Sequence, residues 1–169
     1  MIRVHRRAGE PTKGVLLLDG QPIRVALGRG GLIANKFEGD GGTPTGTFRP
    51  LRLWWRKDRH MRPRTGLPIR IIGPSDGWCE DPADRHYNRP VRLSPGNTAD
   101  RLKRDDHLYD FIIEIDHNTR PRVANRGSAV FLHLARPAFA PTAGCIAMTR
   151  ASMLRLLARL GPRTRIVVG

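Results

Sequence analysis

Two side chains in the segment 129–148, His133 and Cys145, have the types and spacing needed for covalent chemistry. A cysteine attacks a carbonyl carbon as its thiolate, and a histidine is the usual base that removes the thiol proton. Gly144 directly precedes the cysteine, and glycine allows a tight turn that brings adjacent backbone N–H groups toward a developing oxyanion. The segment therefore predicts a thiol acyl-transfer site.

The competing interpretation is that both are ordinary core residues, which is common for an isolated histidine and cysteine. Two features favour the chemical interpretation. The stretch from Thr142 to Cys145 is a turn of small residues rather than a strand or helix face, and the chain has only two cysteines, so Cys145 belongs to no disulfide framework. The second cysteine, Cys79, follows a tryptophan and is expected to be a buried thiol. Both thiols are expected to be free.

The chain carries 30 lysines and arginines against 15 acidic residues, a formal net charge of +15. This balance favours a polyanionic partner, which is nucleic acid, an anionic membrane surface or the acidic cell-wall polymer. A nucleic-acid partner is not expected, because the arginines are scattered, no aromatic RNA-reading motif is present, and the cysteine and histidine spacings match no zinc finger. The densest basic stretch, 52–64, is predicted to be an exposed loop, either solvated or facing the substrate.

A length of 169 residues suits one domain, 1–169, with a core of its own. The 18 glycines and 14 prolines favour short strands joined by turns over a helical bundle. No apolar run approaches the roughly 18 residues of a membrane span. No apolar signal segment follows the charged first residues, so an export signal is expected to be either absent or already removed.

The hydrophobic pattern places His133 on a strand and a helix after Cys145. Apolar runs predict strands at 15–18 and 23–27, joined by a tight hairpin at Asp19-Gly20. Further strands are predicted at 67–72, 111–115, 130–134 and 165–168, and the nearly continuous run 111–115 is expected to be central. Thr149 is the expected N-cap of a helix over 151–160. The polar stretch 74–106 has no predicted element, and a loop of that length is usually functional or disordered. The pattern predicts a mainly β fold with few helices.

Several short motifs resemble the catalytic domain of L,D-transpeptidases, the YkuD-type fold, in the same order along the chain. They are 36–48, which resembles the family's Thr-Pro-x-Gly-x-Phe motif; 77–81, Tyr87-Asn88 and Tyr109-Asp110, which resemble its middle blocks; and 128–133 and 142–145, which resemble its catalytic end. The resemblance covers nearly the whole chain. It implies a β-sandwich of mixed sheets with a capped helix after the nucleophile.

The resemblance also implies a substrate and a mechanism, in which peptidoglycan stem peptides are both donor and acceptor. Cys145 would attack a carbonyl of the donor stem and release its tail, and the thioester would then pass to an amine of the acceptor stem. His133 would generate the thiolate, and the backbone N–H groups of Gly144 and Cys145 would stabilise the oxyanion. Such a mechanism requires no cofactor and no metal ion. The nucleophile is expected to lie in an open cleft.

The sequence departs from the family pattern Ser/Thr-His-Gly-Cys-x-Arg/Asn at two positions. Ala143 stands where the family commonly has a second histidine, and Ala147 stands where it has arginine or asparagine. The loop between His133 and Cys145 is also short, with eleven residues. We therefore expect a reshaped donor pocket and an atypical choice of donor bond, such as the L-Ala–diaminopimelate bond of 1-3 type cross-links.

Further residues are expected to bind the substrate. Arg136 lies on the loop between base and nucleophile and is expected to bind a stem carboxylate through paired hydrogen bonds. Thr142, Tyr87, Asn88 and Asp84 are expected to line the same cleft.

Two alternatives stay open. If water outcompetes the acceptor amine, the enzyme is an L,D-carboxypeptidase or endopeptidase on the same stems. If the departures at Ala143 and Ala147 have made the site degenerate, the protein is a non-catalytic basic module that binds polyanions. As an enzyme of cell-wall biogenesis and cell shape, it is expected to be a monomer in the periplasm or elsewhere in the cell envelope.

Overall fold

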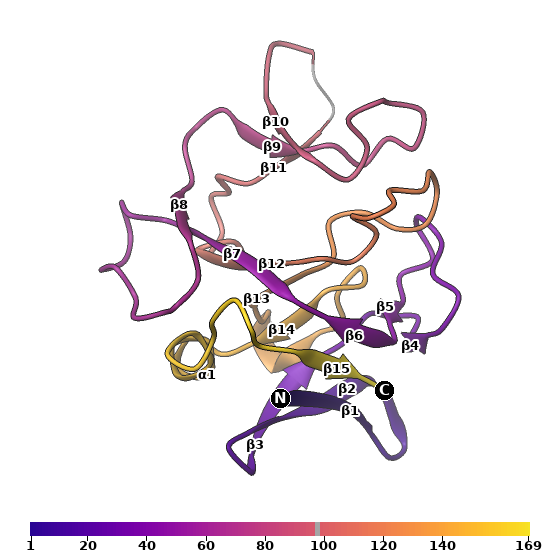
Figure 1. Ribbon diagram of the computed structural model, residues 1–169, viewed down its shortest axis with the longest axis vertical. Coiled ribbons are helices and arrows are strands. Elements are labelled where there is room, and N and C mark those ends of the chain that lie inside the picture. The colour runs from indigo at the N-terminus through magenta and orange to yellow at the C-terminus, as the bar shows by residue number, and fades with distance from the viewer. Residues whose placement is uncertain (97–98) are drawn as a thin grey trace.

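The computed structural model describes residues 1–96 and 99–169 (Figure 1). Within them lie a ten-stranded mixed sheet in the order β6–β15–β1–β2–β3–β14–β13–β12–β7–β8, a three-stranded sheet in the order β10–β9–β11, and the pair β4–β5. The strands are β1 (Ile2–Arg7), β2 (Glu10–Leu18), β3 (Gln21–Ala26), β4 (Leu32–Ile33), β5 (Thr43–Pro44), β6 (Gly46–Phe48), β7 (Pro50–Trp55), β8 (Ile69–Ile71), β9 (Asp76–Trp78), β10 (Pro90–Arg92), β11 (Asp100–Arg101), β12 (Phe111–Ile115), β13 (Phe131–Leu134), β14 (Ile146–Met148) and β15 (Ile166–Val168).

The predicted hairpin near the N-terminus is confirmed. Strands β2 and β3 pair antiparallel up to Leu18 and Gln21, and the turn between them consists of Asp19 and Gly20. Both turn residues have positive φ, 50° and 77°. Two consecutive residues of this kind match the right-handed twist of the strands that they join.

The helix after the nucleophile is also confirmed. Helix α1 (Arg150–Leu157) begins after Thr149, whose hydroxyl accepts a hydrogen bond from the backbone N–H of Ser152 at 3.2 Å. It ends three residues before the predicted end at 160, because its last turn tightens: the N–H of Leu160 bonds to the carbonyl of Leu157. Together with a single-turn 3-10 helix, η1 (Pro137–Phe139), it leaves the described chain mainly β, as predicted.

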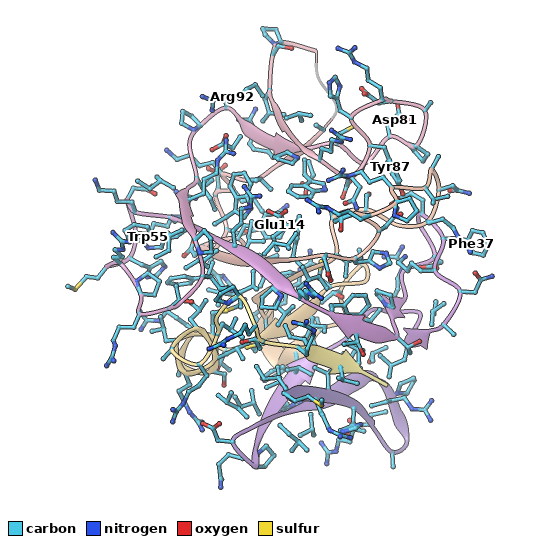
Figure 2. All side chains as sticks on the ribbon, in the orientation of Figure 1. Phe37, Trp55, Asp81, Tyr87, Arg92 and Glu114 are labelled. Atoms are coloured by element: carbon cyan, nitrogen blue, oxygen red, sulfur yellow. The ribbon has the colours of Figure 1, made fainter. Side chains whose placement is uncertain are left out.

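Strand β12 is central, as its continuous apolar run predicts. It lies between β13 and β7, and all five of its residues are buried. Alternate residues serve two cores: Phe111 and Ile113 pack into the main core with α1, whereas Ile112 packs into a second core on the opposite face. On that second face Glu114 accepts a hydrogen bond from Trp54 Nε1 at 2.9 Å, and its carboxylate lies in the middle of the molecule (Figure 2).

The prediction of an exposed loop over 52–64 is wrong for its first part. Residues 52–55 belong to β7, and Trp54 and Trp55 are both buried. The arginine that suggested a surface, Arg52, forms an ion pair with Glu114 at 3.1 Å. Side chains of adjacent residues on a strand point to opposite faces of the sheet, so both tryptophans are buried only because both faces are covered. The local sequence does not reveal that both faces are covered.

The stretch 74–106, expected to be irregular, contains a small sheet. Strand β9 pairs antiparallel with both β10 and β11, and this sheet lies at the end of the molecule opposite the β1–β3 strands (Figure 1). Trp78 on β9 and Leu102 after β11 pack into the second core. The sheet therefore covers the face of β7, β12 and β13 that the main core does not use. None of the described helices is long and apolar enough to cross a membrane.

Candidate active site

Parallel pairing of β13 with β14 brings His133 and Cys145 to one side of the sheet. His133 on β13 lies opposite Ala147 on β14, and Cys145 immediately precedes β14. Because side chains alternate along a strand, His133 points to the same face as Phe131, and Cys145 packs with Phe131 in the second core. Both His133 and Cys145 line one pocket with a volume of about 400 Å³.

Basic and small side chains line the pocket. Three arginines line it, Arg29, Arg104 and Arg136, together with the ring of Tyr109. The two departures from the family motif, Ala143 and Ala147, line it as well. Two methyl groups therefore stand where a histidine and an arginine or asparagine are common, and the space that those side chains would fill is left to the substrate.

The turn that carries the nucleophile is held by hydroxyl groups. The Thr142 hydroxyl donates to the carbonyl of Cys145 at 2.6 Å and accepts from the N–H of Gly144 at 3.1 Å. The Thr43 hydroxyl approaches the same carbonyl at 3.5 Å and accepts from the N–H of Gly28 at 2.8 Å. The position of Cys145 is thus fixed through its own carbonyl, and the role of Thr142 in the resting site is to hold this turn.

Gly144 cannot be replaced without disturbing the turn. Its φ is +140°, and a β-carbon there would lie 2.8 Å from the carbonyl oxygen of Gly42. Gly42 in turn has no room for a side chain, because a β-carbon would lie 1.9 Å from the Ile33 side chain. Gly144 is therefore required by the close approach of its backbone to that of Gly42, and Gly42 is required by the Ile33 side chain that packs against it.

The loop that contributes Gly42 to this contact is stabilised by a partly buried ion pair. The ammonium group of Lys36 binds Asp40, and it also donates to the carbonyl of Phe37 at 2.7 Å. Asp40 accepts from the N–H groups of Phe37 and Gly42 at 2.7 and 2.8 Å. The methylene chain of Lys36 lies against Gly144. The first motif of the sequence is thus a support for the nucleophile turn.

One backbone donor is free to stabilise an oxyanion. The resemblance assigned this role to the N–H groups of both Gly144 and Cys145, but in the resting turn the Gly144 N–H bonds to Thr142. The N–H of Cys145 has no hydrogen-bond partner among the residues that the structure describes. Among the described residues, the Cys145 N–H is therefore the donor of the two that has no competing acceptor.

The thiol of Cys145 is buried and protonated, contrary to the expectation of an open cleft. Cys145 is 8% exposed. Its Sγ donates a hydrogen bond to the carbonyl of Ala129 at 3.1 Å and accepts one from the N–H of Phe131 at 3.4 Å. Burial raises the pKa of Cys145 to about 12, and the carboxylates of Asp100 and Glu80 act in the same direction. The side chain of Cys145 is therefore a neutral thiol rather than a thiolate.

His133 is a neutral base. Its Nδ1 lies 2.8 Å from the carbonyl of Leu134, and since a carbonyl only accepts, Nδ1 carries the proton and Nε2 keeps its lone pair. Burial lowers the pKa of His133 to about 4, and the positive charges of Arg136 and Arg104 act in the same direction. The histidine and the cysteine therefore form a neutral pair in the unliganded site.

Tyr109 lines the pocket. The sequence placed it in one of the family motifs but gave it no role. Its ring meets that of His133 edge to face at 5.4 Å, and its hydroxyl donates to Asp100 at 3.1 Å. Burial raises the pKa of Tyr109 well above its ordinary value. The Arg104 guanidinium lies 5.1 Å from the ring centroid. Tyr109 thus fixes the orientation of the His133 ring.

The structure places the predicted substrate residues in two groups. Arg136 and Thr142 line the pocket of Cys145 and His133, whereas Tyr87, Asn88 and Asp84 do not. The pocket arginines Arg29 and Arg104 were missed, because nothing in their local sequence distinguishes them from the many other arginines of this chain.

Asn88 is connected to the nucleophile through the backbone. Its side-chain oxygen accepts from Trp78 Nε1 at 3.1 Å and from the N–H of Ala129 at 3.2 Å. Its amide group donates to the carbonyls of His117 and Asn118 at 3.1 and 2.9 Å. Because the carbonyl of Ala129 accepts from the Cys145 thiol, Asn88 holds the segment against which the thiol rests.

Tyr87 and Asp84 lie farther from the chemistry. The Tyr87 hydroxyl donates to Glu38, and its side chain is buried. Asp84 accepts from the backbone N–H of His86 at 2.7 Å and lines a different pocket together with Cys79. Figure 2 shows Tyr87 and Asp81 near the small sheet, in the upper part of the molecule. Both cysteines are free thiols, and no group of three or more His, Cys, Asp or Glu side chains is arranged for a metal ion in the described residues.

The site thus consists of a turn that carries Cys145, a strand that carries His133 and a supporting loop that contains a Thr-Pro pair. This arrangement agrees with a family model. The model of the L,D-transpeptidase catalytic domain, YkuD, matches residues 10–168. The chain belongs to this family. No curated protein and no solved structure matches it significantly.

Membership of the L,D-transpeptidase family establishes the general activity and substrate class. The family comprises enzymes of L,D-transpeptidase type that act on the cell wall, with peptidoglycan stem peptides as substrates. This membership confirms the resemblance read from the motifs. The roles of the individual residues, the donor bond and the cellular location stay predictions.

Proposed function

We propose that this L,D-transpeptidase forms cross-links between peptidoglycan stems, with Cys145 as the nucleophile and His133 as the base. The observation that carries the proposal is the geometry of one pocket. It is lined by a histidine of β13 with a free Nε2 and by a cysteine on a hydroxyl-held glycine turn immediately before β14, the strand that pairs in parallel with β13. Nucleophile and base on neighbouring, well-packed elements are the requirement for covalent acyl transfer.

In the first step Sγ of Cys145 attacks a carbonyl carbon of the donor stem, and the thiol proton passes to Nε2 of His133. The N–H of Cys145 donates to the oxyanion of the tetrahedral intermediate. The carbon–nitrogen bond then breaks, the proton moves from His133 to the departing amine, and a thioester remains. In the second step the acceptor amine attacks the thioester and its proton passes to His133. The carbon–sulfur bond breaks as the new amide forms, and His133 returns the proton to sulfur, which restores the thiol.

The neutral resting pair requires that proton transfer accompany attack. With a thiol pKa of about 12 and an imidazole pKa of about 4, the ion pair is scarcely populated before substrate binds. Attack on a carbonyl moves negative charge from sulfur to oxygen, where a backbone donor receives it, and this removes the penalty of a buried thiolate. The site is therefore inert toward solvent until a substrate carbonyl occupies it.

The choice of donor bond follows from the open space beside the nucleophile. Ala143 and Ala147 line the pocket where larger polar side chains are common in the family. We propose that the donor residue lies deeper or turned relative to the usual arrangement, which favours an atypical bond such as L-Ala–diaminopimelate and a 1-3 type cross-link. Defined stem peptides that differ only in length, with the released tail identified by mass spectrometry, distinguish this bond from cleavage after diaminopimelate.

Incubation of purified muropeptides with the protein tests the reaction type. Cross-linked dimers identified by mass spectrometry support transfer. Loss of the tail with monomers as the only products instead identifies an L,D-carboxypeptidase or endopeptidase, and the absence of any product leaves only the basic binding module. Product from the Cys145→Ala variant would contradict the assignment of the nucleophile.

The Cys145→Ala variant is expected to lose all product formation while it keeps its fold. Because the thiol is buried, the substitution removes a sulfur from the second core and is expected to lower the free energy of unfolding by about 1 kcal/mol. Denaturant unfolding of the two proteins measures this difference. Cys79→Ala, which removes the other buried thiol, is the matched control and is expected to keep activity.

Family membership also supports a location outside the cytoplasm, and we propose the periplasm. Fractionation of producing cells tests this. Recovery of the protein only with cytoplasmic markers would point to the processing of peptidoglycan precursors instead.

A further inference from the structure

Two pocket arginines, Arg29 and Arg136, lie on different loops that meet at the nucleophile turn. The backbone N–H of Arg29, which follows β3, donates to the carbonyl of Thr142 at 2.9 Å. Arg136 begins the loop that contains η1 and leads to the same threonine. Both side chains line the pocket of Cys145. We call these two residues the arginine pair.

Neither member of the arginine pair has an acidic partner among the described residues. Both are exposed, and every described ion pair of the chain involves other residues. The third pocket arginine, Arg104, differs: it bonds Asp106 with two nitrogens, the shorter contact being 2.7 Å. Two uncompensated positive charges therefore face the pocket.

The side chain of Arg29 is held in place without a carboxylate. A β-carbon on Gly41 would lie 2.8 Å from its Nε and 3.0 Å from its Cζ, so the guanidinium rests on a backbone that lacks a side chain. Gly41 has a φ of +69°, a conformation that glycine adopts without strain. The loop therefore leaves room for this exposed arginine, and packing against Gly41 restricts the positions that its side chain can adopt.

The nearest carboxylates do not neutralise the arginine pair. Asp100 accepts from Tyr109, and Asp106 is engaged by Arg104. The positive charge of Arg136 reaches the interior, where it disfavours protonation of His133. The missing counter-charge is thus expected from the ligand. A guanidinium binds a carboxylate through two parallel hydrogen bonds, whereas a neutral amide supplies neither the charge nor two acceptors.

We propose that the arginine pair selects donor stems that carry free carboxylates, rather than amides, on the residues next to the bond that is broken. This inference rests on the proposed function for the identity of the substrate. The selection also has a chemical consequence. A bound carboxylate offsets the charge of Arg136 and makes it easier for His133 to accept the thiol proton, so the carboxylate contributes to turnover as well as to binding.

Two small alkylating reagents test the charge preference without peptidoglycan. Iodoacetate and iodoacetamide both place a CH2 group on sulfur with loss of iodide, and they differ only in carboxylate against amide. We expect the ratio of the iodoacetate rate to the iodoacetamide rate to be at least fivefold higher at Cys145 than at Cys79, whose pocket is lined by Glu80, Asp81 and Asp84. Peptide mapping by mass spectrometry resolves the two cysteines.

Arg29→Gln and Arg136→Gln are expected to lower the ratio at Cys145. Because the ratio compares two reagents at the same thiol, a change in the reactivity of the thiol itself alters both rates alike and leaves the ratio unchanged. Arg155→Gln, an exposed arginine of α1 that lines a different cavity, is the matched control and should change neither rate. An equal ratio at both cysteines, or a ratio unchanged in both variants, would overturn the inference.

Paired stem peptides extend the test to the substrate. Replacing each carboxylate beside the scissile bond with an amide is expected to lower kcat/KM of the wild type tenfold to a hundredfold, and to have less effect in the variant whose arginine binds that group. Equal turnover of both peptides would refute carboxylate selection while leaving the transpeptidase proposal intact. A preference for iodoacetate without turnover of any stem would refute the proposed function while leaving the arginine pair intact.

Discussion

At the scale of residues, the site combines a thiol that resists ionisation with a base that resists protonation. Burial is the main cause of the raised pKa of Cys145 and of the lowered pKa of His133. Cys145 is buried because it belongs to the second core. A neutral pair has a practical advantage, because an unoccupied site holds no reactive thiolate. Reactivity then depends on how well the substrate carbonyl, the Cys145 N–H and Nε2 of His133 are brought together.

Removal of the base is expected to make the reaction depend steeply on pH. At neutral pH His133→Ala should lower the rate of product formation at least a hundredfold, as is usual for loss of a general base. With a thiol pKa of about 12, the thiolate fraction rises tenfold per pH unit up to that value, so the variant should recover activity as pH rises. Rates measured between pH 6 and 10 check this. If the His133→Ala variant keeps the wild-type rate of product formation at neutral pH, the assignment of His133 as the base is wrong.

The same histidine links stability to pH. Its pKa of about 4 in the folded chain lies below the ordinary value of 6.5. Above pH 6.5 His133 is neutral in both the folded and the unfolded chain, so it does not make the free energy of unfolding depend on pH. As pH falls toward 4, His133 takes up a proton only in the unfolded chain, and the free energy of unfolding falls by up to about 3 kcal/mol. Denaturant unfolding at pH 7 and pH 4 measures this. His133→Gln removes the titrating group and should lose less stability over that interval than the wild type does.

At the scale of elements, we expect catalysis to depend on the contact between two loops that are distant in sequence. The loop with Lys36, Asp40 and Gly42 supports the turn with Thr142 and Gly144 through a backbone approach that only glycine permits. The motif pattern identified both loops. It did not show that the threonine hydroxyl occupies the Gly144 N–H, because hydrogen bonding within a turn depends on backbone angles that a single sequence does not specify.

Addition of one methyl group at Gly144 tests this contact. Gly144→Ala places a β-carbon 2.8 Å from the Gly42 carbonyl at a φ of +140°, so the turn must shift. We expect product formation to fall at least a hundredfold and the free energy of unfolding to fall by about 1–3 kcal/mol. Gly161→Ala is the control, because a β-carbon there meets no atom within 4 Å. Equal activity of the two variants would show that the contact does not position the nucleophile.

At the scale of the whole molecule, the sequence predicted the mainly β fold, the hairpin, the central strand and the helix cap, because each depends on a local pattern. It failed where burial is decided by distant partners. Trp54 and Trp55 read as part of a basic loop, but the small sheet covers one face of β7 and the main core covers the other. Asn88 was predicted to bind the substrate, but its side chain instead forms hydrogen bonds with four partners. Those partners belong to other segments of the chain, so the local sequence does not reveal them.

The net charge of +15 is expected to draw the protein to the anionic cell wall. Within the stretch 52–64, Arg52, Arg56 and Arg59 are engaged with acidic groups, whereas Arg62 and Arg64 are exposed. Sedimentation with purified sacculi should therefore fall as salt rises through the physiological range, and Arg62→Gln with Arg64→Gln should weaken it further. Binding that ignores salt, or a preference for DNA over sacculi at physiological ionic strength, would contradict this expectation.

The position of β14 in the sheet also has a consequence for folding kinetics. This strand, which follows the nucleophile, lies between β13 and β3, and Ala147 pairs with Ala26 from the first hairpin. Pairing between segments so far apart in the chain forms slowly, because the closure of a long loop precedes it. During refolding Cys145 is therefore expected to stay accessible until the N-terminal hairpin joins the sheet. Refolding samples can be exposed to a short pulse of alkylating reagent at successive times. The time at which Cys145 becomes protected from alkylation then shows when the active site is complete.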